Sequence, residues 1–131
     1  MSLSRTLLSS ALLLAAAAGL TACQPDYGSL DISVESSPPV AVDIRDHSFE
    51  VPLGVAVLIK VEPISGNNND YVETDEVELD SKDSDVLAVD PGSKARTFVL
   101  TGRAVGSTCV QVYVNGRAEE CIDAKTSDAN F

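Results

Sequence analysis

The sequence contains a single histidine, His47, and no catalytic arrangement of residues around it. Asp46 precedes His47, but adjacent residues of an extended chain point to opposite sides, so the two do not form a catalytic pair. No Ser-His-acid set, Cys-His nucleophile pair, phosphate-binding glycine loop or four-ligand metal motif can be assembled from the chain. We therefore expect no enzyme activity and no cofactor, with His47 in a surface loop.

Positive charge is also scarce. Nine Lys and Arg stand against 20 Asp and Glu, which gives a formal net charge of −11. Only Arg5 of the basic residues lies in the first 22 residues, whereas every acidic residue follows them, so the remainder is more acidic still. Such a surface repels nucleic acid and anionic lipid headgroups. We expect no nucleic-acid partner. Solvation of the surface is the simplest interpretation, although a cationic partner or Ca²⁺ would also suit it.

A helical period of 3.6 residues is absent after residue 22. Instead, short stretches of alternating apolar and polar residues recur between Gly and Pro turns. They lie at 30–34, 40–44, 55–61, 77–80, 86–89, 98–101, 108–114 and 118–124. This pattern predicts an all-β sandwich in one domain. The apolar members of the alternations predict its core: Val57, Ile59, Val77, Leu79, Val86, Val110 and Val112.

One long apolar run is present, from Thr6 to Leu20, after a short segment with the single charge of Arg5. It is too short to cross ~30 Å of hydrocarbon comfortably and is typical of a cleaved signal. The four residues Leu20-Thr21-Ala22-Cys23 that end it resemble the lipobox of bacterial lipoproteins. The resemblance implies cleavage before Cys23 and lipid on Cys23. An uncleaved signal anchor and an ordinary secretory signal are the alternatives.

The lipobox resemblance sets the expected organisation: a signal peptide at 1–22, a lipidated N-terminus with a short linker at 23–28, and one β-sandwich domain at 29–131. Two or three acyl chains on Cys23 would anchor the protein permanently in a membrane. In lipoproteins of two-membrane bacteria, an Asp after the cysteine often marks retention at the inner membrane. Gln24 therefore favours the outer membrane of the cell envelope.

The two other cysteines, Cys109 and Cys121, are an even pair in an oxidising compartment, so they predict a disulfide. Asn115-Gly116 between them is a hairpin turn signal. A three-residue loop, Val114 to Gly116, would place the cysteines directly opposite each other on the solvent face. A two-residue turn would put them on opposite faces, so the disulfide favours the longer loop. Which kind of ladder position the pair occupies is left open.

Acidic residues gather between positions 70 and 90. Asp80, Asp83 and Asp85 flank one turn and are weak candidates for Ca²⁺ ligands, because Ca²⁺ takes six to eight oxygen atoms. The spacing of an EF-hand loop is absent. We prefer the interpretation of a solvated turn and expect no metal site.

Two segments together resemble group 2 bacterial Ig-like domains. The first is Val-Glu-Leu-Asp-Ser-Lys-Asp-Ser-Asp-Val-Leu-Ala-Val-Asp, residues 77–90. The second is Leu-Thr-Gly-Arg-Ala-Val-Gly-Ser-Thr-Cys-Val, residues 100–110, which is similar to the Gly followed by alternating Thr and aliphatic residues of that family. The resemblance covers roughly residues 49–115 and implies an Ig-like antiparallel β-sandwich. It also implies surface display, adhesion or a spacer role, without catalytic residues. Leu79 stands where the family often has Trp, and the Cys109–Cys121 pair is extra.

Two kinds of function remain. The first is a membrane-anchored lipoprotein carrying a non-catalytic Ig-like structural or adhesion module. The alternative is a periplasmic accessory or inhibitor lipoprotein that binds a protein partner and, in one form of this hypothesis, responds to Ca²⁺. This partner-binding alternative predicts a contiguous exposed apolar surface. The candidate residues for it are Leu58, Tyr71, Val99 and Tyr113.

Overall fold

Nine β-strands make up the described part of the chain. The structure, a computed structural model, describes residues 24–128. Its strands are β1 (Tyr27–Val34), β2 (Asp43–Arg45), β3 (Ser48–Pro52), β4 (Ala56–Ser65), β5 (Val77–Ser81), β6 (Leu87–Pro91), β7 (Thr97–Gly102), β8 (Gly106–Val114) and β9 (Arg117–Ser127). The predicted all-β fold is confirmed. Among residues 24–128 there is no helix long and apolar enough to cross a bilayer. The predicted signal segment and lipobox lie outside the described residues.

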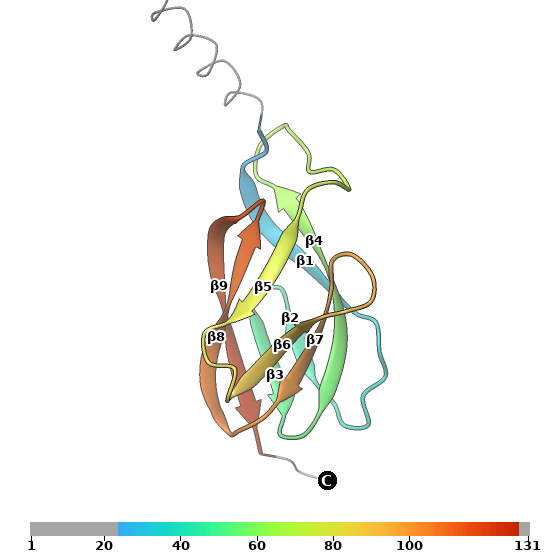
Figure 1. Ribbon diagram of the computed structural model, residues 1–131, viewed down its shortest axis with the longest axis vertical. Coiled ribbons are helices and arrows are strands. Elements are labelled where there is room, and N and C mark those ends of the chain that lie inside the picture. The colour runs from blue at the N-terminus through green and yellow to red at the C-terminus, as the bar shows by residue number, and fades with distance from the viewer. Residues whose placement is uncertain (1–23, 129–131) are drawn as a thin grey trace, which may run out of the picture.

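The strands form two sheets that pack face to face (Figure 1). One sheet has the order β1-β4-β7-β6, and the other has the order β2-β3-β9-β8-β5. The first sheet has the strand order A-B-E-D of an immunoglobulin constant-type sandwich, with β1 as A, β4 as B, β7 as E and β6 as D. In the second sheet, β5, β8 and β9 correspond to strands C, F and G. The strand order therefore confirms an Ig-like β-sandwich. The additional strands β2 and β3 extend the second sheet beyond β9.

One strand pair of the second sheet is parallel. β3 pairs with β9 in parallel, with Phe49 opposite Ala124 and Val51 opposite Thr126, whereas the other ladders between the named strands are antiparallel. Alternation of apolar residues reports which side chains share a face but carries no information about strand direction. A parallel neighbour also has no tight turn joining it to its partner, so no local signal announces the pair.

The buried core lies between the two sheets. It confirms six of the seven predicted core residues, whereas Val86 is only half-buried. Val86 belongs to the turn before β6, where its N–H donates to the carbonyl of Asp83, and the neighbouring Leu87 is fully buried in its place. The buried apolar set is Leu30, Phe49, Val51, Val55, Val57, Ile59, Val61, Val77, Leu79, Leu87, Phe98, Leu100, Val110, Val112, Val114, Ile122 and Ala124.

The turn between β8 and β9 is shorter than predicted. Val114 pairs with Arg117, which leaves a loop of only Asn115 and Gly116. Both loop residues have positive φ, 51° and 78°, as the two central residues of a type I′ turn require. The three-residue loop expected from the cysteine positions is therefore wrong.

A β-bulge near this turn restores the common face of the cysteines. Tyr113 pairs with Ala118, but the next pair along the ladder is Val112 with Glu120, so Glu119 is the extra residue. An extra residue in one strand reverses the facing of every residue beyond it. The cysteines consequently lie on one face although the turn has two residues, and they are diagonal neighbours rather than directly opposite.

Candidate functional site

The end of the sandwich where residue 24 lies is built from three segments of the chain. They are residues 24–26, the β4–β5 loop (residues 66–76) and the β8–β9 turn, and we call this the N-terminal end (Figure 1, top). The C-terminal part of β9 and the turns before β4, β6 and β8 lie at the opposite end, where the Leu53 N–H bonds to the Ser127 carbonyl and the Arg103 N–H to that of Val86.

The segment before β1 is bonded to the domain from its first described residue. The Gly66 N–H donates to the Asp26 carbonyl at 2.7 Å, and Asn67 Nδ2 donates to the Gln24 carbonyl at 3.3 Å. A Cβ added to Gly28 would lie 2.9 Å from the Gly66 nitrogen, so glycine permits this close approach of the two backbones. Tyr27 and Gly28, which the sequence placed in a linker, belong to β1. The segment before the first strand is therefore shorter than predicted.

Tyr27 and Glu120 join the two sheets at the N-terminal end. Glu120 shares the inward face of β9 with Ile122 and Ala124, because side chains of a strand alternate and the bulge sets their phase. Its Oε1 accepts a hydrogen bond from the Tyr27 hydroxyl. Burial of the ring, and then the nearby Glu120 carboxylate, raise the pKa of Tyr27 far above its ordinary value. Sequence reasoning missed this pair, because a bulge leaves no distinct local pattern.

The Tyr27 hydroxyl gives the domain a predictable response to alkali. Because the folded-state pKa of Tyr27 is raised, its contribution to stability is complete below the ordinary tyrosine pKa of about 10 and is lost as the pH rises above that value. Tyr27→Phe should cost about 1–3 kcal/mol at pH 7, because the half-buried Glu120 carboxylate loses its donor. The difference between the two proteins should shrink above pH 10. Urea denaturation at pH 7, 9 and 10.5 measures it, and a pH-independent difference would contradict the assignment.

Arg96 holds the β4–β5 loop from the side of the first sheet. Its Nη2 donates to the carbonyls of Val72 at 2.6 Å and Asp75 at 2.9 Å, while Nη1 lies 3.3 Å from Glu62 Oε2. The side chain is only 13% exposed, and its backbone φ of 61° is rare for a residue with a Cβ. The loop is therefore fixed by a buried cation that bonds to its backbone.

Asp75 ties the same loop to the β8–β9 turn. Its Oδ2 accepts the Val72 N–H at 2.7 Å, and its Oδ1 accepts Asn115 Nδ2 at 3.0 Å. Asn115 in turn accepts the Glu76 N–H at 2.9 Å. The Val72 N–H, followed by the Asn115 amide, lowers the pKa of Asp75, so this carboxylate stays ionised at neutral pH.

A cavity of about 370 Å³ lies among these segments. Its walls include Pro25, Tyr71, Asp75, Val114, Arg117 and Glu119. The Glu119 side chain is 18% exposed, whereas that of Arg117 is 82% exposed, and Arg117 Nε lies 3.8 Å from Glu119 Oε1. Burial of Tyr71, together with the charges of Glu119, Asp75 and Asp26, raises the pKa of the Tyr71 hydroxyl. The cavity thus combines an aromatic wall with an excess of negative charge.

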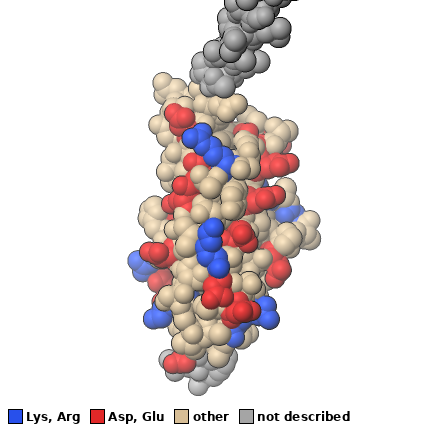
Figure 2. Space-filling model, turned by 60° about the vertical axis from the view of Figure 1, so that its left-hand side comes forward, with Lys and Arg blue, Asp and Glu red and all other residues tan. Residues whose placement is uncertain are grey.

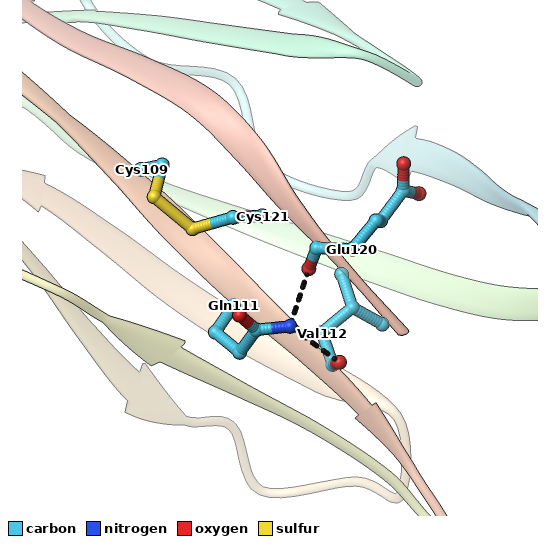
Figure 3. The surroundings of a disulfide bond; sticks show 5 residues. All are labelled: Cys109, Gln111, Val112, Glu120 and Cys121. Atoms are coloured by element: carbon cyan, nitrogen blue, oxygen red, sulfur yellow. Dashed lines mark hydrogen bonds between the residues drawn. A yellow bond between two sulfur atoms is a disulfide. The ribbon is translucent and has the colours of Figure 1, made fainter. Parts of the chain in front are cut away.

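The disulfide lies on the outer face of the β8–β9 hairpin, as predicted (Figure 3). Cys109 and Cys121 are joined with their Cα atoms 5.4 Å apart. In the ladder Cys121 is opposite Gln111, and Cys109 is opposite Asp123. Gln111 Nε2 donates to the carbonyls of Glu120 at 2.8 Å and Val112 at 3.2 Å. The Gln111 amide therefore bonds carbonyl groups on both strands where the bulge interrupts the regular ladder.

Replacement of both Cys109 and Cys121 by Ser should leave a folded domain that is less stable by about 3 kcal/mol, the chain-entropy value for a loop of this length. The fold should persist because the buried valines of β8 do not depend on the bond. Urea denaturation of the variant measures the loss, and reduction of the wild-type protein should reproduce it. Two free thiols in a non-reduced digest of exported protein would contradict the pairing.

The acidic turn does not bring its three candidate residues into a metal-binding group. Within residues 24–128, no three His, Cys, Asp or Glu side chains are grouped closely enough to hold a metal ion. Asp83 Oδ1 instead accepts the Asp85 N–H at 3.1 Å, and the Asp83 carbonyl accepts the N–H groups of Val86 and Leu87. Asp80 lies on β5, opposite Gln111. Asp83 therefore shapes the turn that leads into β6.

The remaining candidates are dispersed. His47 is exposed in the turn between β2 and β3. Leu58 and Val99 are paired neighbours on β4 and β7, Tyr113 is opposite Glu78 on the other sheet, and Tyr71 lines the cavity. Because Leu58 and Val99 lie on one sheet and Tyr113 on the other, the four apolar candidates do not form one surface. On the side of the molecule that carries β9, Lys and Arg are interspersed among Asp and Glu (Figure 2).

No protein-family model matches the chain, and no curated protein matches it in sequence. Among solved structures, the chain is similar to domains 4 and 5 of the S-layer protein SbsC, with 17% sequence identity and a TM-score of 0.47. The similarity covers 79% of this chain, which spans about half (53%) of the S-layer chain.

Proposed function

We propose that the protein is a cell-envelope lipoprotein whose Ig-like domain is a non-catalytic structural or adhesion module, held rigidly at its lipid anchor. The non-catalytic role is supported by the site residues. The sole histidine lies in an exposed turn, and the Asp83 carboxylate of the acidic turn accepts the backbone N–H of Asp85. The disulfide fits a domain that folds in an oxidising compartment.

The bonded segment before β1 is the observation that carries this proposal. Cys23 would be separated from the first strand by only residues 24–26, and two of these accept hydrogen bonds from the β4–β5 loop. Three residues span at most about 10 Å, so a lipid on Cys23 would hold the N-terminal end close to the headgroups. The opposite end, with the turns before β4, β6 and β8, would then point away from the membrane. A module without a flexible stalk suits a display or spacer role.

Cys23→Ser tests the anchor. We expect the wild-type protein to partition into the detergent phase and the variant to be recovered in the aqueous phase or as unprocessed precursor, because the acyl chains supply the membrane affinity. The Cys109→Ser/Cys121→Ser variant is the matched control and should partition like wild type. Unchanged membrane extraction of Cys23→Ser would reject the lipoprotein assignment.

Membrane separation by density tests the location: wild type should follow the outer membrane, and Gln24→Asp should move toward the inner membrane.

A further inference from the structure

The cavity at the N-terminal end has the position of a lipid-headgroup site if the proposed anchor holds. Pro25, two residues after Cys23, forms part of its wall together with Tyr71. Two residues of extended chain reach only about 7 Å, so the cavity would lie at the level of the headgroups of the membrane that holds the lipid. The ligands within its reach are therefore those that a membrane surface offers, and the inference rests on the proposed anchoring.

The charged side chains that line the cavity are two carboxylates and one guanidinium, a balance that favours a cation over an anion. The Glu119 side chain is only 18% exposed, and its Oε1 lies 3.8 Å from Arg117 Nε. Asp75 stays ionised because the Val72 N–H and the Asn115 amide bond to it. Tyr71 lines the same cavity as Asp75 and Glu119. An ammonium group is favoured by partly desolvated carboxylates and by the face of an aromatic ring.

We propose that this cavity binds the ammonium group of a phosphoethanolamine-type lipid headgroup. Glu119 and Asp75 balance the ammonium charge, and Tyr71 covers it. Arg117, exposed at the rim, supplies the positive charge for the phosphate of the same headgroup. The proposal also explains how an acidic end can face a membrane: it repels anionic headgroups but attracts the outermost group of a zwitterionic one.

The first experiment titrates the purified lipidated protein in detergent with O-phosphoethanolamine and follows the backbone amides of Tyr71, Arg117 and Glu119 by NMR. We expect saturable shifts that weaken about tenfold or more in Glu119→Gln, since loss of a charged partner removes a charge-assisted bond. Glu78→Gln, on the outer face of β5, is the matched control and should bind as wild type does. Melting curves of both variants check that they are folded.

Four outcomes would overturn the proposal. They are the absence of a saturable shift, equal binding by a folded Glu119→Gln variant, reproduction of the shift by ammonium chloride or Ca²⁺, and binding of Nα-acetyl-lysine amide without binding of O-phosphoethanolamine. The last would assign the cavity to a basic side chain of a protein partner. Because the titration uses a dissolved headgroup, it gives a result whether or not Cys23 carries lipid, and detergent partitioning reports separately on the anchor.

A second experiment distinguishes the lipid from the free headgroup. The lipidated protein is reconstituted in vesicles of phosphatidylethanolamine with phosphatidylcholine, or of phosphatidylglycerol with phosphatidylcholine. Amide hydrogen exchange of the β4–β5 loop and the β8–β9 turn should be slower with phosphatidylethanolamine, and Glu119→Gln should abolish the difference. Equal exchange in the two kinds of vesicle would reject the lipid as the source.

Discussion

Phe49→Ala should lower the free energy of unfolding by about 3–5 kcal/mol, the range for removing a fully buried aromatic side chain. Phe49 is 1% exposed and is the largest of the fully buried side chains. It lies on β3, the strand that joins β2 to β9 in the second sheet, so the cavity left behind would lie between the sheets. Urea denaturation followed by circular dichroism measures the change.

Val105→Ala is the control for this measurement, because Val105 is 54% exposed in the turn before β8 and should change stability by no more than about 0.5 kcal/mol. A loss below about 1 kcal/mol for Phe49→Ala would mean that β3 contributes little to the core. The position of β3 beside β9 would then need revision.

The substitution Gly102→Ala should cost about 3 kcal/mol or more, because it forces an atom into the backbone of another strand. A Cβ at Gly102 would lie 2.4 Å from the Pro52 carbonyl oxygen, a contact that no side-chain rotation relieves. The backbone here is also fixed by hydrogen bonds, from the Gly102 N–H to the Val55 carbonyl and from the Gly54 N–H to the Gly102 carbonyl. The ends of β3 and β7 would have to separate.

Gly106→Ala is the matched control, since the nearest atom to its added Cβ is a side-chain carbon of Val86 at an ordinary 3.4 Å. Thermal melting of the two variants compares them directly. If Gly102→Ala melts like Gly106→Ala, the close approach of β3 and β7 does not exist in solution.

The local sequence pattern was enough to predict most of the strands and most of the core residues. Val57, Ile59, Val110 and Val112 could be assigned to the core because alternation along a single strand decides which side chains face inward, whatever the partner strand is. The cysteine pair was predictable for a similar reason: with Cys23 assigned to lipid, only two cysteines remained to pair. These inferences need only neighbouring residues or a count.

Other features depend on contacts between distant parts of the chain. β3 escaped prediction because Ser48–Pro52 is short and its parallel partner, β9, lies near the other end of the sequence. The bulge at Glu119 escaped prediction. The Asn115-Gly116 turn signal and the shared face of the two cysteines were each explained by a regular hairpin without a bulge, and only the assembled sheet shows the bulge that satisfies both.

The sequence by itself determined most of the strand pattern, most of the core and the disulfide partners, because each follows from periodicity or from counting. The tertiary structure decided the parallel β3–β9 pair, the inward direction of Glu120 and the cavity at the N-terminal end. That cavity draws Pro25, Tyr71 and Glu119 from three separate segments. Its electrostatic character arises only when folding brings their side chains together and partly removes them from water.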